Sequence, residues 1–93
     1  MIYQVEISDE AAENIQMHLK AGNTKLVAKI SAFIDQLGEH PRSGTGKPER
    51  LKGYGDREMW SRHIDSKHRL TYEIKESQLI VTALSAYGHY GDK

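Results

Sequence analysis

The strongest constraint on the fold is the spacing of apolar residues between Thr24 and Leu37. They recur every three or four positions, at Leu26, Val27, Ile30, Phe33, Ile34 and Leu37. This spacing predicts an amphipathic helix over 24–37, which Gly38 ends and Pro41 cannot continue. Such a helix must bury its apolar face against another element, so the rest of the chain must supply a partner surface.

The segment before this helix predicts a strand and a first helix. Residues 2–7 alternate between two sides, which is typical of a half-buried strand. Ser8 or Asp9 can cap the helix that follows. Residues 21–23 stop that helix, and Asn23 can cap the next one. The apolar positions that share one face of the first helix are Ala12, Ile15 and Leu19.

The second half of the chain predicts an antiparallel meander. Residues 42–50 form a loop rich in glycine and charge, and a short strand can begin at Leu51. The strands expected after it cover 58–64, 68–75 and 78–86, with tight turns between them. The predicted fold is therefore α+β: one antiparallel sheet, built from the N-terminal strand and the meander, with a helical hairpin packed on one face. Residues 1–93 are expected to form a single domain.

Composition excludes several classes of function. The chain has no cysteine, so disulfides, thiolate metal sites and cysteine nucleophiles are excluded. The N-terminus shows no signal peptide, and no apolar run approaches the length of a membrane span, so a cytoplasmic protein without a membrane partner is expected. The formal net charge is zero, which argues against a strong general affinity for nucleic acid.

The charge is unevenly distributed along the chain. Residues 1–40 carry three lysines against six acids, whereas residues 41–75 carry nine basic residues against five acids, giving −3 and +4. Within or just after the basic part lie the sequences GTGKPERLK, WSRHI, HRLTY and the late GHY. An acid, an arginine and a histidine on separate segments can form an acid–base pair with an electrostatic clamp between them.

These motifs, in this order, closely resemble those of the Txe/YoeB family of bacterial toxins, within the RelE/ParE-like superfamily. The resemblance covers nearly the whole chain and implies a RelE-like fold. It implies a metal-free ribonuclease that cuts messenger RNA on the ribosome and needs no cofactor. It also implies a cognate antitoxin of the YefM/Axe kind as partner, and it is compatible with a homodimer because relatives dimerise.

The resemblance assigns roles to particular residues. Glu49 matches the general base that takes the proton of the RNA 2′-hydroxyl, and its basic neighbours favour the ionised carboxylate. His89 matches the general acid, Arg69 the phosphate clamp, and Tyr90 a group that stacks on a base or bonds to the phosphate. The expected additional phosphate contacts are Lys47, Lys52 and Arg62. Arg62 can serve only if it shares a face of the hairpin with Arg69.

Alternative interpretations stay open at this point. A ParE-like member would bind and inhibit DNA gyrase without catalysis, and a degenerate member would only bind its antitoxin. His63 and His68 flank a turn, but no cysteine accompanies them and their spacing is not diagnostic of a metal site. Trp60 and Tyr72 are expected to be packing residues, and His18 and His40 surface residues. His63 occupies a position where the family often has a second arginine.

Overall fold

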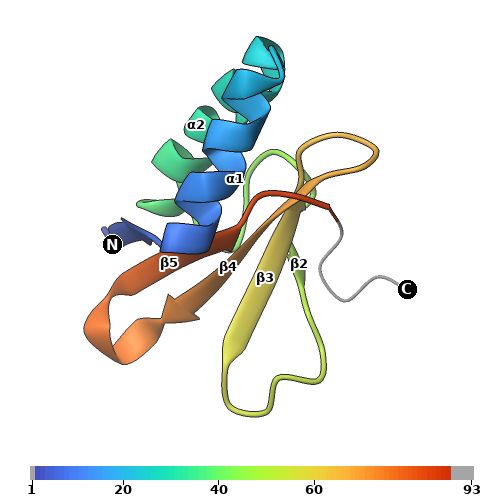
Figure 1. Ribbon diagram of the computed structural model, residues 1–93. Coiled ribbons are helices and arrows are strands. Elements are labelled where there is room, and N and C mark those ends of the chain that lie inside the picture. The colour runs from blue at the N-terminus through green and yellow to red at the C-terminus, as the bar shows by residue number, and fades with distance from the viewer. Residues whose placement is uncertain (1, 89–93) are drawn as a thin grey trace.

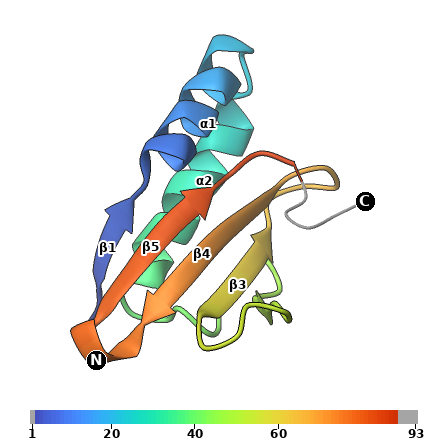
Figure 2. The same ribbon diagram turned by 60° about the horizontal axis from the view of Figure 1, so that its bottom comes forward.

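The computed structural model describes residues 2–88 and shows two layers, a sheet and a pair of helices (Figure 1). The elements in chain order are β1 (Gln4–Ile7), α1 (Asp9–Lys20), α2 (Thr24–Leu37), β2 (Glu49–Arg50), β3 (Glu58–His63), β4 (Arg69–Lys75), a short 3-10 turn (Glu76–Gln78) and β5 (Ile80–Ser85). Both helices lie on the same side of the sheet (Figure 2). The predicted α+β fold with a helical hairpin on one face is confirmed.

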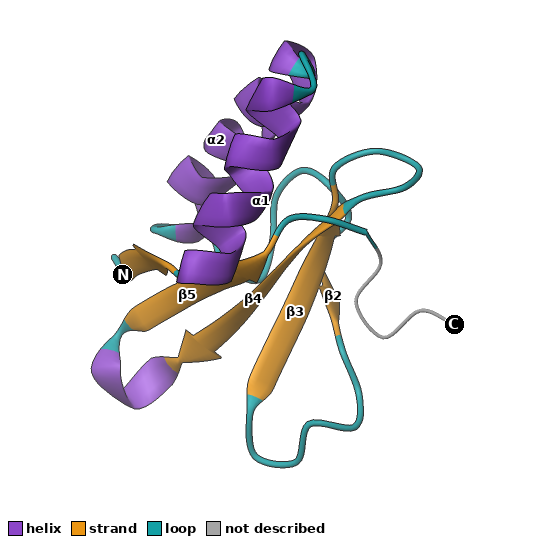
Figure 3. Cartoon of the chain, viewed as in Figure 1, coloured by secondary structure: helices purple, strands orange, loops and turns teal. Residues whose placement is uncertain are grey.

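The described strands form one sheet in the order β1-β5-β4-β3-β2. Figure 3 labels four of them, β5, β4, β3 and β2. The meander from β2 to β5 is antiparallel as expected, but β1 pairs with β5 in parallel. The sheet is therefore mixed rather than wholly antiparallel. A parallel pair needs a long crossover, and the helical hairpin together with the meander supplies it.

The inner face of α1 differs from the predicted one. Ala12 and Leu19 are exposed, whereas Ala11 and His18 are buried and Ile15 is half-buried. His18, expected at the surface, is only 2% exposed, and its Nε2 lies 2.9 Å from the carbonyl oxygen of Ala86. Polar side chains on this face of α1 form hydrogen bonds with the backbone just after β5. A prediction from apolar spacing alone therefore identified the wrong inner face.

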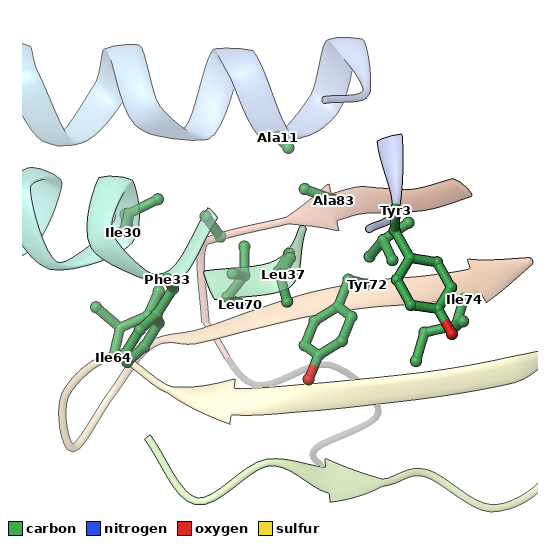
Figure 4. Packing of buried hydrophobic residues seen from close by; sticks show 12 residues of the cluster. Tyr3, Ala11, Ile30, Phe33, Leu37, Ile64, Leu70, Tyr72, Ile74 and Ala83 are labelled. Carbon is green, nitrogen blue, oxygen red and sulfur yellow. The ribbon is translucent and has the colours of Figure 1, made fainter. Parts of the chain in front are cut away.

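The hydrophobic core lies between the helices and one face of the sheet (Figure 4). Helix α2 contributes Ile30, Phe33 and Leu37, the inward positions of its predicted apolar stripe. The strands contribute the alternate residues that face the helices, among them Leu70, Tyr72, Ile74, Val81 and Ala83. Trp60 packs against this cluster and Tyr72 is buried within it, which confirms both as packing residues. The side chains between these positions point to the other face of the sheet, which we call the open face.

Candidate functional site

The open face brings the predicted acid and the predicted clamp together. Glu49 pairs with Ser61 across β2 and β3, and Ser61 pairs with Thr71 across β3 and β4. Arg69 lies two residues before Thr71 on β4, so its side chain points to the same face. Strand spacing places the Cα atoms of Glu49 and Arg69 roughly 12 Å apart, so both long side chains can reach a group between them.

The two charged side chains have no polar partner in the described part of the chain. Across residues 2–88, neither the Glu49 carboxylate nor the Arg69 guanidinium makes a hydrogen bond or an ion pair. Among residues 2–88, the buried Nε of Arg69 has no hydrogen-bond partner. A buried donor without an acceptor costs stability, so this arrangement is typical of a site that awaits a ligand.

The loop before β2 presents the predicted basic residues. Lys47 is exposed and has a positive φ of 52°, which is uncommon for a residue with a side chain. Lys52, just after β2, is exposed as well. Both side chains are therefore accessible, on either side of Glu49 in the sequence.

Arg62 occupies a different place from the one its predicted role requires. It pairs with Leu70, which belongs to the core, so Arg62 points away from the face of Arg69 and is 0% exposed. Its Nη2 donates to the carbonyl oxygens of His40 and Ser43, the latter at 2.8 Å. The expectation that Arg62 contacts phosphate is therefore wrong, because its guanidinium is buried beneath the helices.

Arg62 instead fastens the loop that leads to Glu49. Its Nη1 donates to Gln36 of α2 at 2.7 Å and to the carbonyl oxygen of Thr45, and its Nε donates to the hydroxyl of Tyr72. The next residue along β3 donates from its backbone to the carbonyl oxygen of Gly46 at 2.7 Å. Neutral acceptors from three elements thus satisfy the buried charge and hold the loop against α2.

Tyr87 and Gly88, the last described residues, lie next to the start of β4. The backbone N–H of Arg69 donates to the carbonyl oxygen of Gly88 at 3.0 Å, and the N–H of Gly88 donates to Nδ1 of His68 at 2.9 Å. His68 also lies against His18 and Tyr87, with ring centroids 4.8 Å from each. Gly88 is therefore fixed beside Arg69. The predicted His89 and Tyr90 lie outside the described residues.

A cluster of ionic groups at the opposite end of the sheet is held together by hydrogen bonds. Arg42 donates two hydrogen bonds to Glu58, at 2.7 and 3.0 Å, and one to Glu76 at 2.8 Å. The hydrogen bond from Arg42 lowers the pKa of Glu58 below its ordinary value, and the indole N–H of Trp60 adds to this. Hydrogen bonds from Tyr3 and then from Arg42 lower the pKa of Glu76. These groups pair with one another, so they stabilise the fold instead of awaiting a substrate.

We also searched residues 2–88 for a metal site, a cavity and a membrane-spanning helix. No group of three or more metal-ligating side chains occurs among residues 2–88. A cavity of about 530 Å³ lies between the start of α2 and the turn at Asp65, away from Glu49. In the same range, neither helix is long and apolar enough to span a bilayer.

Sequence reasoning missed two residues on the open face, Ser61 and Thr71. Both are buried, and their hydroxyl oxygens have no hydrogen-bond partner within residues 2–88. Their position could have been read from the strand alternation, since Thr71 has the same parity as Arg69 and pairs with Ser61. The sequence could not show that each hydroxyl lacks a hydrogen-bond partner, because hydrogen bonding depends on how the folded chain packs.

Comparison with known proteins finds relatives that are similar to this chain in sequence and in fold. A toxin named YoeB from Mycobacterium bovis is 40% identical over 70 residues, 75% of this chain and 79% of that protein. A toxin YoeB from Streptomyces coelicolor is 36% identical over 80% of this chain and 84% of that protein. The solved structure of a YoeB/ParE toxin from Agrobacterium tumefaciens superposes with a TM-score of 0.81 at 27% identity, covering 94% of this chain and 99% of that one. The YoeB dimer from Staphylococcus aureus superposes with a TM-score of 0.78 at 26% identity, covering 97% of this chain and all of that one.

The family assignment rests on more than single relatives. The family model of the YoeB-like toxin of bacterial type II toxin–antitoxin systems matches residues 8–90. This range includes Glu49, Arg69 and the sequence positions His89 and Tyr90. The chain therefore belongs to the YoeB-like toxin family of bacterial type II toxin–antitoxin systems.

Proposed function

We propose that this chain is a metal-free endoribonuclease that cuts messenger RNA on the ribosome. The observation that carries the proposal is the placement of Glu49 and Arg69 on one open face, unpaired in the described structure, with Gly88 bonded to the backbone of Arg69. Cleavage of a phosphodiester uses a base that takes the proton of the attacking hydroxyl and a cation that stabilises the charge on the phosphate, and both must reach the same substrate group.

The proposed reaction uses the ribose next to the scissile phosphate. Glu49 takes the proton of the 2′-hydroxyl, and the 2′-oxygen forms a bond to phosphorus. The bond from phosphorus to the 5′-oxygen breaks, and His89 gives that oxygen a proton. The products are a 2′,3′-cyclic phosphate and a 5′-hydroxyl. Arg69 stabilises the extra negative charge on the phosphoryl oxygens, because its planar guanidinium suits phosphate geometry.

Three further residues support substrate binding in this proposal. Tyr90 stacks on a base or bonds to the phosphate, and Lys47 and Lys52 contact neighbouring phosphates. The exposure of both lysines beside Glu49 supports this role. Because few cations are involved and the net charge is zero, most of the affinity must come from the ribosome that presents the RNA.

Two partners follow from the family. Solved structures from Staphylococcus aureus show YoeB in complex with YefM and as a dimer. We infer that this chain binds an antitoxin of that kind through an acidic, flexible segment that reaches the basic surface near Lys47 and Lys52, and that it can form a homodimer. Charge reversal at Lys52 should weaken the complex, and unchanged binding would count against this contact.

The test is messenger-RNA cleavage by translating ribosomes, followed by mapping of the cut ends. Glu49→Ala, Arg69→Ala and His89→Ala should each lower the cleavage rate, with losses of about 10²- to 10⁴-fold expected for the base and the acid. Glu6→Ala on β1 and Lys75→Ala at the far end of β4 are matched controls and should cleave like the wild type. A folded wild type that leaves the RNA intact would refute the proposal. Gyrase inhibition or antitoxin binding alone would then be tested.

A further inference from the structure

The centre of the open face holds a group of polar atoms that lack a partner. In the described structure, these atoms are Ser61 Oγ, Thr71 Oγ1 and Arg69 Nε. Ser61 is 1% exposed and Thr71 is 0% exposed, so bulk solvent has little access to either side chain. Native structures satisfy nearly all buried polar atoms, and each exception needs an explanation.

The register places the three residues next to one another. Ser61 and Thr71 face each other across β3 and β4, where Cβ atoms of a direct pair lie roughly 5 Å apart. Arg69 is the next residue on the same face of β4. Glu49 is the direct neighbour of Ser61 on the other side. The unpaired atoms therefore form a continuous row that starts beside the proposed base.

The chemistry of these atoms indicates the kind of ligand. The Nε of arginine can only donate a hydrogen bond, and a hydroxyl can donate one as well. A ligand with several acceptor oxygens can satisfy all three, and a phosphodiester offers such oxygens with a negative charge that suits the guanidinium. Glu49 and Arg69 make no polar contact within residues 2–88, so no hydrogen bond or ion pair in that range competes with a ligand for these side chains.

We propose that the hydroxyls of Ser61 and Thr71, together with Arg69 Nε, bind the non-bridging oxygens of the RNA phosphodiester beside Glu49. This proposal rests on the proposed function and deepens it by adding two substrate-binding residues to the site. The unmet hydrogen bonds of the unliganded protein are then a cost to stability that binding removes.

The structure provides a matched control in Thr82. Its Oγ1 is also buried and unpaired in the described part of the chain, and it lies on the same face. Thr82 is on β5 and pairs with Glu73, away from Glu49. Removal of any of these hydroxyls should leave the protein at least as stable, whereas only Ser61 and Thr71 should affect binding.

The experiment combines thermal unfolding with binding of a 2′-O-methyl hexanucleotide of mixed sequence. This probe keeps the phosphodiesters but has no 2′-hydroxyl, so it cannot be cleaved. Binding is followed by NMR titration of backbone amides at low salt. The variants are Ser61→Ala, Thr71→Val and the control Thr82→Val, with Thr71→Ser to restore a hydroxyl.

Ser61→Ala and Thr71→Val should each weaken binding about tenfold, because each loses a hydrogen bond to a charged group. Thr82→Val and Thr71→Ser should bind like the wild type, and no variant should unfold at a lower temperature. Unchanged binding by Ser61→Ala and Thr71→Val would overturn the proposal. A large loss of stability in both variants would also overturn it, since it would show that the hydroxyls support the fold.

The same variants are assayed for messenger-RNA cleavage on ribosomes. If the wild type cleaves and both variants cleave equally well, the hydroxyl row is refuted while the proposed function stands. If the wild type does not cleave but the two variants lose binding of the probe, the phosphodiester site stands while the proposed function fails.

Discussion

At the scale of single residues, Arg62 and Arg69 show how strand alternation separates two similar side chains. Arg69 points to the open face, and Arg62 points to the core, where Phe33 and Tyr72 lie against its guanidinium at 5.8 and 5.7 Å from their ring centroids. A buried charge is tolerated only when its donors are satisfied, and Arg62 meets this condition with carbonyl and side-chain oxygens. Its role in this structure is to hold the loop before Glu49.

Replacement of this residue should therefore affect stability. Arg62→Met keeps much of the volume but leaves the carbonyl groups of His40 and Ser43 without their donor. We expect a loss of about 2–4 kcal/mol in the free energy of unfolding, measured by urea titration, because unmet buried acceptors cost more than removal of the buried charge returns. The control Arg50→Met, at an exposed position of β2, should change it by less than about 0.5 kcal/mol. Equal effects of the two substitutions would contradict the role of Arg62 in holding the loop before Glu49.

Glu58 gives a prediction for pH. Its pKa is lowered from 4.5 in the folded state by the hydrogen bonds from Arg42 and Trp60. A lowered folded-state pKa contributes stability that is fully present above the ordinary value and is lost as the pH falls through the folded-state value. The free energy of unfolding should therefore decrease as the pH falls below 4.5.

The test is the pH dependence of urea unfolding in Glu58→Gln. This variant should be less stable than the wild type at pH 7 by roughly 1 kcal/mol, and the difference should shrink towards acid pH. A difference that stayed constant down to the acid limit would show that the ionised Glu58 is not the group responsible.

At the scale of elements, the loop from Gly44 to Lys47 depends on close packing against α2. A Cβ atom at Gly46 would lie 2.6 Å from the ring of Phe33, and Gly46 has a positive φ of 84°. Gly53, after β2, has a similar φ of 90° but open space around it. The two glycines therefore separate backbone strain from steric overlap.

Gly53→Ala should cost about 1 kcal/mol, since only the left-handed backbone penalises the side chain. Gly46→Ala should cost about 1–3 kcal/mol more, because the new methyl group also displaces Phe33 from the core. Thermal unfolding monitored by circular dichroism measures both. The same loop precedes Glu49, so Gly46→Ala should also slow cleavage, whereas equal stability of the two variants would show that the loop can yield.

The elements differ in how well the sequence predicted them. Helix α2 was predicted with its observed bounds, because six apolar residues at three- and four-residue spacing fit a helix and no other regular element. The prediction of the inner face of α1 was wrong, because Asn14 and His18 point inward and form hydrogen bonds with the backbone of Ala86, which is far along the chain. Asn23 occupies the N-cap position of α2, but its side chain makes no capping bond. Local patterns predict elements, whereas polar contacts between distant segments need the assembled fold.

The candidate site shows the same limit. Motif resemblance selected Glu49 and Arg69, and the structure places both on one face. The resemblance also selected Arg62, which the register assigns to the core. Ser61 and Thr71 could not be singled out from the sequence, because a serine or threonine in a strand usually finds a partner or water.

At the scale of the whole molecule, the layers are connected through both ends of the chain. β1 lies beside β5, and Tyr3 bonds to Glu76 at 2.6 Å. His18 of α1 forms a hydrogen bond with the carbonyl oxygen of Ala86. Gln36 of α2 accepts a hydrogen bond from Arg62. These contacts join residues far apart in the sequence, so neither the helical hairpin nor the meander buries its apolar face without the other.

We therefore expect the described residues to unfold as one cooperative unit, in keeping with the prediction of a single domain over 1–93. The only tryptophan, Trp60, lies in β3 and reports the sheet through its fluorescence, whereas far-ultraviolet circular dichroism reports mainly α1 and α2. In a urea titration both signals should give the same midpoint and the same slope, since a two-state transition has no populated state with one layer folded. Earlier loss of the helical signal would show that the hairpin separates from the sheet. The loop before Glu49, which is held against α2, would then be released before the sheet unfolds, and cleavage should be lost at that lower urea concentration.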